Sequence, residues 1–310
     1  MISKSSKIYV AGHRGMVGSA TLRKLKKEGY SNLIFKTSKE LDLRNQSLVD
    51  RFIAEQKPEL IIDAAAIVGG IWANNEYPFK FLMDNMQIQN NLINAAVKNR
   101  VENFIFLGSS CIYPRDVQQP LKEEYLLTSS LESTNQWYAL AKITGVKLIE
   151  AARKVYGYNY VSLMPTNLYG PNDNFDLKKS HVLPALIRKF HEAKTQNSDV
   201  IIWGSGTPKR EFLYVDDLAE AIFYFILNPA KKSLYNIGSD RELTIKELGE
   251  LIKNIVEFKG DIKFDASYPD GTPRKLLDSS KARKLGWSPK INLEEGIKLV
   301  YKEFLNGPYA

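Results

Sequence analysis

Tyr138 and Lys142 are the pair of residues whose types and spacing point most directly to chemistry. They lie in the stretch 135–145, which contains alanine and leucine but no proline and is therefore predicted to be helical. A spacing of four residues places both side chains on one helical face, one turn apart. An ammonium beside a phenol favours the phenolate and would lower the phenol's pKa from about 10, which makes Tyr138 a candidate proton donor. The same pair also occurs on solvated helix faces, so its meaning depends on the rest of the chain.

A glycine-rich turn follows the first predicted strand, as a dinucleotide site would require. Residues 7–11 form an apolar run, then Gly12, Gly15 and Gly18 follow at a spacing of three, and 19–28 carry apolar residues at helical spacing. In a strand–turn–helix unit, small residues let the backbone approach a pyrophosphate, and the helix N-terminus offers free N–H groups. The alternative is a tight turn without a ligand, but the strand–turn–helix context favours a cofactor site.

Cations rather than an acid follow the second predicted strand, residues 32–35. An NAD site uses a carboxylate here to bind the ribose 2′-hydroxyl, whereas the 2′-phosphate of NADP requires positive charge. No acidic residue occurs between the end of this strand and Glu40, and Arg14, Lys36 and Lys39 are available. The sequence therefore predicts NADP(H), although exposed lysines on a turn would give the same pattern.

Strands and helices alternate through the first half of the chain. Predicted strands lie at 59–62, 103–107 and 159–164, and predicted helices at 47–56 and 78–100, before the Tyr138 helix. This alternation predicts an α/β fold of the Rossmann type, with a doubly wound parallel sheet and ligands at the carboxyl ends of its strands. The loop 108–114 and the segment 165–171 follow two of these strands, so both would share one crevice with the glycine turn.

That crevice would bring together Ser109, Tyr138 and Lys142. A hydroxyl, a phenol and an ammonium suit the reduction of a ketone by a hydride. Tyr138 would protonate the carbonyl oxygen, and Ser109 would hydrogen-bond that oxygen as negative charge develops. Ser109 could also be a turn residue.

The alternation breaks after Gly170. The later segments are a polar loop at 172–179, a helix at 182–193, a strand at 200–203, the segment 210–218 leading into an apolar helix that ends at 227, a strand at 234–238, and elements at 244–256, 262–264 and 293–304. We predict a cofactor domain of residues 1–170, to which 211–238 returns. Residues 171–210 and 239–310 would form a smaller mixed α/β C-terminal lobe.

Composition narrows the classes of protein. The 310 residues are 44% hydrophobic and 25% charged, which is ordinary for one large globular domain or two modest ones. The one cysteine, Cys111, excludes an intrachain disulfide and fits a reducing compartment. No apolar run reaches the roughly 20 residues that span a bilayer, so a cytoplasmic protein without a membrane partner is predicted. The net charge of +8 comes from scattered residues, so it does not indicate a nucleic-acid partner. No metal site is predicted either.

Six motifs together resemble the extended short-chain dehydrogenase/reductase family and, within it, the GDP-L-fucose synthases. The motifs lie at 12–18, 68–75, 108–114, 165–171, 203–208 and 269–275. The resemblance covers nearly the whole chain. It implies NADPH, a GDP-4-keto-6-deoxy sugar bound between the lobes, and a homodimer that packs through helices of the cofactor domain.

The family's catalytic roles map onto five residues. Ser109, Tyr138 and Lys142 resemble its reduction triad, with Lys142 also reaching the nicotinamide ribose. Cys111 and His181 match its epimerisation pair. A ketone at C4 acidifies the protons on C3 and C5, so a thiolate and an imidazole on opposite faces could remove and return them. Without the resemblance, a single cysteine and a loop histidine would be interpreted as structural.

The resemblance also implies two binding sets. For the cofactor these are Gly12, Arg14, Gly15, Met16, Val17, Gly18, Lys36, Ser38, Lys39, Asp42, Leu43, Ala64, Ala65, Leu107, Gly108, Lys142, Pro165, Asn167, Leu168 and His181. For the substrate they are Ser110, Asn167, Lys189, Trp203, Arg210, Asp270 and Lys275.

Two departures from the family pattern bear on specificity. Some bacterial members have an arginine where this chain has Ser38, so 2′-phosphate recognition would rest on Arg14 with Lys36 or Lys39. Many carry a lysine where this chain has Ile67. The expected reaction converts GDP-4-keto-6-deoxy-D-mannose to GDP-L-fucose. The alternatives are C4 reduction of another GDP-4-keto-6-deoxy sugar such as a heptose, with or without epimerisation, and an NADP-sensing scaffold without catalysis.

Overall fold

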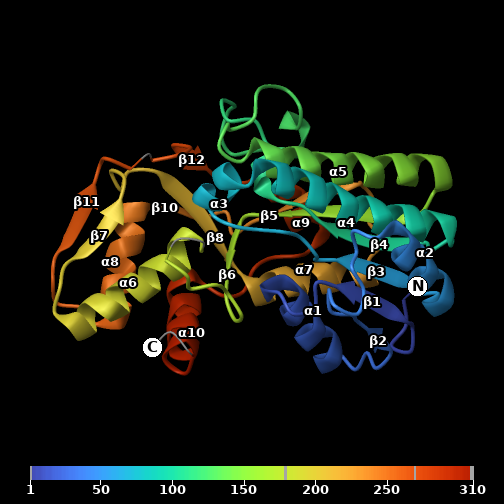
Figure 1. Ribbon diagram of the computed structural model, residues 1–310, viewed down its shortest axis with the longest axis horizontal. Coiled ribbons are helices and arrows are strands. Elements are labelled where there is room, and N and C mark those ends of the chain that lie inside the picture. The colour runs from blue at the N-terminus through green and yellow to red at the C-terminus, as the bar shows by residue number, and fades with distance from the viewer. Residues whose placement is uncertain (1, 178–179, 269, 308–310) are drawn as a thin grey trace.

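The computed structural model describes residues 2–177, 180–268 and 270–307, apart from the side chains of residues 71 and 72. Residues 178 and 179 of the predicted polar loop and Pro269 of the 269–275 motif lie outside the described residues. The elements form two parts that lie side by side in Figure 1, a larger one around the first strands and a smaller one that carries most of the C-terminal elements. No helix among the described residues is long and apolar enough to cross a membrane.

A six-stranded parallel sheet forms the centre of the larger part. Its strands are β1 (Ile8–Ala11), β2 (Leu33–Ile34), β3 (Leu60–Asp63), β4 (Asn103–Leu107), β5 (Asn159–Pro165) and β9 (Leu234–Ile237). They lie in the order β2-β1-β3-β4-β5-β9, and every neighbouring pair is parallel. The chain therefore starts in the middle of the sheet and winds outward in both directions, which confirms the predicted doubly wound fold.

Helices cover both faces of this sheet (Figure 1). One layer consists of α2 (Gln46–Gln56), α4 (Pro78–Lys98) and α5 (Gln136–Tyr156), and the other of α1 (Met16–Lys27), α7 (Val215–Leu227) and α9 (Ser280–Leu285). Successive strand residues point to opposite faces, so Tyr9 packs under the first layer and Ile8 under the second. Because both faces are covered, the strands are mostly apolar rather than alternating, and Asp63 and Ser162 are among the few buried polar residues in them.

Two glycines fix the position of α5, which carries Tyr138 and Lys142. A Cβ atom at Gly145 would lie 2.4 Å from the ring of Phe106 on β4, so the glycine lets the helix approach the sheet closely. Gly157 follows the last turn with a φ of 73°, a left-handed conformation that glycine adopts without steric cost and that ends the helix. The site residues on α5 are therefore held directly over the strand ends.

The smaller part is built on two short sheets. A four-stranded sheet combines β6 (Asn167–Tyr169), β8 (Lys209–Tyr214), β10 (Glu242–Thr244) and β12 (Arg274–Lys275), and a two-stranded sheet pairs β7 (Val200–Trp203) with β11 (Ile262–Asp265). Their apolar residues pack with α6 (Val182–Gln196), α8 (Ile245–Val256) and α10 (Leu293–Leu305) in a separate core. Strand β9 lies in the central sheet, whereas β8 belongs to the four-stranded one.

The structure differs from the sequence prediction at two strands. Strand β6 lies inside the segment 165–171, for which no strand was predicted, and β8 includes residues predicted only to lead into a helix. These two strands pair with each other, with Asn167 opposite Phe212. Their hydrogen-bond partners are far away in sequence, so local residue patterns do not show them.

Candidate active site

The carboxyl ends of the central strands bring most of the predicted cofactor residues to one edge of the sheet. Gly12 follows β1, Ala64 and Ala65 follow β3, and Leu107 and Gly108 lie at the end of β4. The neighbouring β5 ends at Pro165, and its amide-bearing neighbour Asn167 donates to the backbone oxygen of Glu211 at 2.8 Å. Ligands of doubly wound folds bind at this edge, as the sequence predicted.

The glycine turn has the shape of a pyrophosphate cradle. Gly12 has a φ of 75°, and a Cβ atom at Gly18 would lie 2.2 Å from the Gly12 carbonyl oxygen, so both positions require glycine. At Gly15, the N-cap of α1, an added Cβ would meet only that same oxygen at 3.4 Å, and no side chain caps the helix. The first N–H groups of α1, around Met16 and Val17, are therefore available to an anion. These residues fit the dinucleotide that the sequence predicts.

The three cations predicted to recognise the 2′-phosphate, Arg14, Lys36 and Lys39, are exposed, and Ser38 is exposed as well. Lys36 also forms an ion pair with Glu40 at 3.5 Å. Hydrogen bonds from Thr37 lower the pKa of Glu40 to about 2, so this carboxylate stays charged and partly neutralises Lys36.

Asp42 and Leu43 are placed differently from the other predicted cofactor residues. Both carboxylate oxygens of Asp42 accept hydrogen bonds from the Arg44 side chain, at 3.0 and 2.8 Å, and this interaction lowers the pKa of Asp42. Leu43 is buried in the core under α4 and α5. In this structure both residues thus have protein partners.

Lys142 and Tyr138 lie together on the inner side of α5. The Nζ atom of Lys142 donates to the carbonyl oxygen of Leu107 at 2.8 Å and lies 4.7 Å above the Phe106 ring. It is 5.9 Å from the centre of the Tyr138 ring, whose other neighbour is the edge-on ring of Phe81. The one-turn spacing predicted from the sequence therefore places both groups over the end of β4.

The expected effect of Lys142 on Tyr138 is wrong for this structure. The sequence predicted a lowered phenol pKa, whereas burial raises the pKa of Tyr138, and Cys111 and Asp63 act in the same direction. Burial also lowers the pKa of Lys142, which Asp63 and Cys111 oppose. Desolvation, together with the charges of Cys111 and Asp63, disfavours the phenolate, so the phenol is kept in its protonated, donating form.

Ser109, Ser110 and Cys111 follow β4 in a single 3-10 turn. Ser109 is the N-cap of this turn, and its Oγ accepts the N–H of Cys111 at 3.3 Å. Cys111 is a buried free thiol. Burial raises its pKa, and Lys275, Ser109 and Lys142 counteract that increase. Cys111 therefore lies in a positive environment that favours a thiolate more than its burial alone would.

His181 and Lys275 enter the site from the smaller part. His181 is the N-cap residue of α6, and its side chain is accessible to solvent. Desolvation by the surrounding protein lowers the pKa of His181, and the positive charge of Lys275 lowers it further. Lys275 lines a small pocket with Ser110 and Cys111. One ammonium thus acts on both predicted epimerisation residues.

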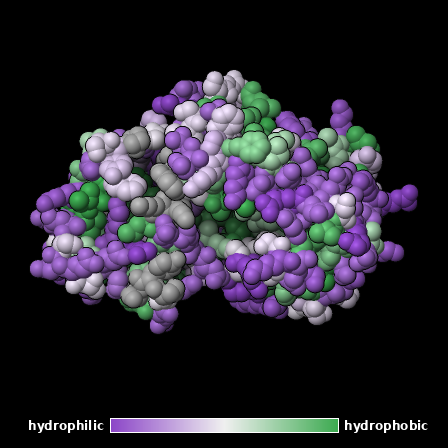
Figure 2. Space-filling view, in the orientation of Figure 1, coloured by the Kyte–Doolittle hydropathy of each residue, from purple (hydrophilic) through white to green (hydrophobic). Residues whose placement is uncertain are grey.

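The remaining predicted substrate residues form a cluster on the smaller part. Arg210 donates to the carbonyl oxygen of Thr272 at 2.6 Å, and the carboxylate of Asp270 accepts from the N–H and hydroxyl of Ser205 at 2.7 and 2.8 Å. Lys189 lies 4.6 Å from the centre of the Trp203 ring. Figure 2 shows a hollow between the larger and the smaller part of the molecule.

Sequence reasoning missed two residues in these surroundings. Tyr268 stacks on Trp203 with ring centres 4.5 Å apart and an interplanar angle of 7°, and both rings are exposed. Asp63 at the end of β3 is fully buried beside the α5 layer. The sequence offered a clue to both, because Asp63 directly follows the predicted strand 59–62 and Tyr268 lies shortly after the predicted strand 262–264. Neither residue belongs to one of the six motifs.

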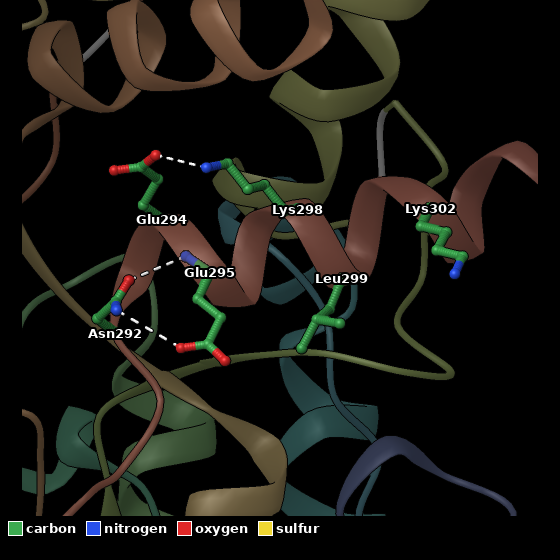
Figure 3. Close-up of a pocket in the computed structure, with 6 residues that line it drawn as sticks. All are labelled: Asn292, Glu294, Glu295, Lys298, Leu299 and Lys302. Atoms are coloured by element: carbon green, nitrogen blue, oxygen red, sulfur yellow. Dashed lines mark hydrogen bonds and ion pairs between the residues drawn. The ribbon is translucent and has the colours of Figure 1, made fainter.

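A separate depression along α10 holds none of these groups (Figure 3). It is lined by Asn292, Glu294, Glu295, Lys298, Leu299 and Lys302. Its charged residues neutralise one another, as in the 2.6 Å ion pair between Glu294 and Lys298. The chemistry of the chain is therefore concentrated at the sheet edge and not on α10.

Comparisons with known proteins decide the family. The sequence pattern of the NAD dependent epimerase/dehydratase family matches residues 8–238, which include the glycine turn, the Tyr138 helix and all six strands of the central sheet. The chain belongs to this family.

Curated members of the epimerase/dehydratase family are similar over nearly the whole chain. GDP-L-fucose synthase 1 of Arabidopsis thaliana is 53% identical over 306 residues, covering 98% of this chain and 95% of its own length. GDP-L-fucose synthase of Escherichia coli is 49% identical over 309 residues, covering 96% of each. The resemblance to GDP-L-fucose synthases predicted from six motifs is thereby confirmed.

A solved structure has the same fold over its full length. The GDP-mannoheptose C4 reductase MlghC from Campylobacter jejuni, solved with NADP bound, superposes with a TM-score of 0.91 at 39% identity. The match covers 98% of this chain and 100% of that chain.

Proposed function

We propose that this chain is an NADP(H)-dependent enzyme that epimerises C3 and C5 of GDP-4-keto-6-deoxy-D-mannose and reduces C4, giving GDP-L-fucose. The observation that carries the proposal is the placement of Tyr138 and Lys142 over the end of β4, beside a glycine turn shaped for a pyrophosphate. Curated relatives near 50% identity with the name GDP-L-fucose synthase support the substrate.

In the reduction, NADPH supplies a hydride to C4 of the sugar. Tyr138 donates its proton to the developing C4 oxygen, and the Ser109 hydroxyl hydrogen-bonds that oxygen. Lys142 uses one N–H to hold the Leu107 carbonyl, so its other donors are left for the nicotinamide ribose. A phenol with a raised pKa stays protonated until negative charge forms on the substrate.

In the epimerisation, Cys111 and His181 move protons at C3 and C5. They come from different parts of the molecule, Cys111 from the turn after β4 and His181 from the start of α6. Two groups on opposite sides of a sugar ring can remove a proton from one face and return one to the other. Lys275 opposes the burial that raises the pKa of the Cys111 thiol. Desolvation, with Lys275 as the second cause, lowers the pKa of His181 and favours its neutral imidazole.

We assign residues 1–170, with 211–238 returning, to cofactor binding, and residues 171–210 and 239–310 to binding of the nucleotide sugar. Strand β8 and helix α9 depart from this division, because β8 pairs within the smaller part and α9 covers the central sheet. Arg210, Lys189 and Lys275 supply cations for the diphosphate, while Trp203 offers an aromatic face to the base. Asn167 and Ser110 lie near the junction of the two regions, where the sugar would sit.

The assembly we propose is a homodimer in the cytoplasm. Exposed apolar side chains gather on the outer side of α4 and α5, where Phe79 is 74% and Met83 is 40% exposed and Leu140 is 39% exposed. A second copy would cover them. A reducing compartment would preserve the Cys111 thiol. Sedimentation of Phe79→Asp should show monomers, whereas Leu299→Asp, an exposed leucine on α10, should not change the assembly.

The alternative substrate is a GDP-4-keto sugar of a different kind. The structural likeness to a GDP-mannoheptose C4 reductase favours this alternative, as does Ile67 in a position where many bacterial relatives have lysine. Reduction would use the same residues, and epimerisation would be reduced or absent.

The decisive experiment uses the purified full chain with NADPH in deuterium oxide. With GDP-4-keto-6-deoxy-D-mannose we expect NADPH oxidation and a product that NMR identifies as GDP-L-fucose with deuterium at C3 and C5. Oxidation without deuterium at these carbons would leave only a C4 reductase. Turnover of a heptose analogue alone would support the alternative, and no turnover of any GDP-keto sugar would overturn the proposal.

A further inference from the structure

Asp63 is a buried carboxylate without an assigned role. It is the last residue of β3, and its side chain is 0% exposed. Ile61, two positions earlier, packs under α4 and α5, so Asp63 points to the same face of the sheet. Burying a charged group is costly unless the surroundings compensate for the lost water.

Only one of its two oxygen atoms is satisfied. The Oδ1 atom accepts the N–H of Ala65 at 3.1 Å. The Oδ2 atom is fully enclosed and has no hydrogen-bond partner in the described part of the chain. Buried polar groups usually have a partner, so an exception at a strand end beside a cofactor site calls for a functional explanation.

Lys142 lies at the same level of the same face. Asp63 is paired in register with Phe106 on β4, and the Lys142 Nζ atom lies 4.7 Å above that phenylalanine ring. The ammonium is also buried, with 3% of the residue exposed, and it donates to the Leu107 carbonyl. The anion and the cation are therefore enclosed side by side over adjacent strand ends, without a direct ion pair between these two described residues.

We propose that Asp63 is a positioning residue whose carboxylate keeps the Lys142 ammonium charged and in place beside Tyr138. This inference rests on the proposed roles of Tyr138 and Lys142 in the reduction. Asp63 touches neither substrate nor cofactor in this scheme, and acts through Lys142.

The electrostatics of the surrounding groups agree with this role. Burial raises the pKa of Asp63 to about 6, with Lys142 opposing the increase, so the carboxylate is ionised at neutral pH. The other ionisable groups that face it are Tyr9 on β1, Tyr138 on α5 and, around Lys142, Cys111 on the turn after β4. Asp63 raises the pKa of both tyrosines and of Lys142. Without its charge, Lys142 and Tyr138 would both lose their protons at lower pH.

The test is the pH profile of kcat for NADPH-dependent reduction, from about pH 6 to about pH 10. Asp63→Asn keeps the size of the side chain and the oxygen that accepts from Ala65. We expect its basic limb to lie about one pH unit or more below that of the wild type, with little change in KM for NADPH. Asp63→Ser, which is also neutral and can accept the same hydrogen bond, should show the same shift if the asparagine variant does not fold.

Ser162→Ala is the matched control. Ser162 pairs in register with Phe106 on the other side, is 0% exposed, and also has an unpartnered side-chain oxygen among the described residues, but it carries no charge. Its basic limb should remain at the wild-type pH. An unshifted limb in the Asp63 variants, or an equal shift in Ser162→Ala, would overturn the inference. Tyr138→Phe distinguishes failure of the Asp63 inference from failure of the proposed function. If Tyr138→Phe keeps wild-type turnover, the proposed catalytic chemistry itself is wrong.

Discussion

The Nζ atom of Lys142 lies 5.9 Å from the centre of the Tyr138 ring, one turn further along α5. Lys142 is buried and Tyr138 is partly exposed, and desolvation by the surrounding protein raises the pKa of the phenol and lowers that of the ammonium. Tyr138 is therefore a protonated phenol, not a phenolate, before the reaction begins. Proton transfer becomes favourable only when hydride addition creates an alkoxide nearby, which couples the two steps of the reduction.

Replacing Tyr138 by phenylalanine should remove the proton donor and little else. We expect kcat for NADPH oxidation to fall by about 10²–10⁴-fold, while NADPH binding measured by fluorescence stays unchanged. Tyr160→Phe is the control, since its hydroxyl is buried at the opposite end of β5 and donates to Val101 at 2.8 Å. That variant should lose about 1 kcal/mol of stability but keep its kcat. Equal loss of activity in both would show that packing, not proton donation, is affected.

Cys111 and His181 should affect proton exchange more than reduction. We expect Cys111→Ser and His181→Asn to slow the incorporation of solvent deuterium at C3 and C5 by about 10²-fold or more, because each removes one acid–base group. Reduction of a substrate already epimerised at both carbons should fall much less. Mass spectrometry of the product measures the exchange. A parallel loss of exchange and reduction would contradict separate roles for the two groups.

The choice between NADPH and NADH should respond to the charges after β2. Arg14→Ala should raise the KM for NADPH by about 2–5-fold and leave that for NADH nearly unchanged, as expected for one exposed charge. Glu40→Gln should have the opposite effect, since it frees Lys36 from its 3.5 Å ion pair. Steady-state kinetics at low and high salt provide the measurement, and both effects should weaken at high salt. Identical changes for the two cofactors would exclude recognition of the 2′-phosphate here.

The sequence was sufficient to predict the central sheet, because its strands are short apolar runs separated by clear helices. The glycine turn and the Tyr138 helix could be placed for the same reason, since each is defined by residues close together in the chain. Strands β6 and β8 could not be predicted, because Asn167 and Phe212 form their pairing across a large sequence separation. Local patterns describe an element but not its partner.

The directions of the pKa changes in the site also could not be predicted from the sequence. The spacing of Tyr138 and Lys142 predicts their shared face, but the sign of the pKa change depends on how deeply α5 is buried. Gly145 allows that burial by bringing the helix against Phe106. The role we propose for Asp63 depends on the register that pairs it with Phe106. Desolvation and register both depend on tertiary packing.

Trp203 and Tyr268 should contribute to binding of the GDP-sugar rather than to chemistry. Their stacked, exposed rings form a flat surface, and stacking of a base on an aromatic side chain is worth about 1–3 kcal/mol. We expect Tyr268→Ala and Trp203→Ala to raise the KM for the GDP-sugar by about 5–150-fold with kcat nearly unchanged. Ile201→Ala, on the same exposed face of β7, is the control and should leave KM unaffected. A decrease in kcat at constant KM would show that the pair does not bind the substrate.

The buried charge of Asp63 should make the protein less stable at neutral and basic pH. Its pKa rises from 3.8 to about 6 on folding, so the folded state disfavours the ionised form that exists above this range. A difference of about two pKa units corresponds to about 3 kcal/mol. The free energy of unfolding therefore falls by about this amount as the pH rises from about 4 to about 6, and it stays lower above about pH 6. Asp63→Asn should therefore unfold at a higher urea concentration than the wild type at about pH 8, and the gain should disappear at about pH 4. A variant that is less stable than the wild type at both pH values would mean that Asp63 mainly supports the fold through Ala65. A gain confined to high pH, together with a shifted basic limb of kcat, would show that the chain gives up stability to keep Lys142 charged.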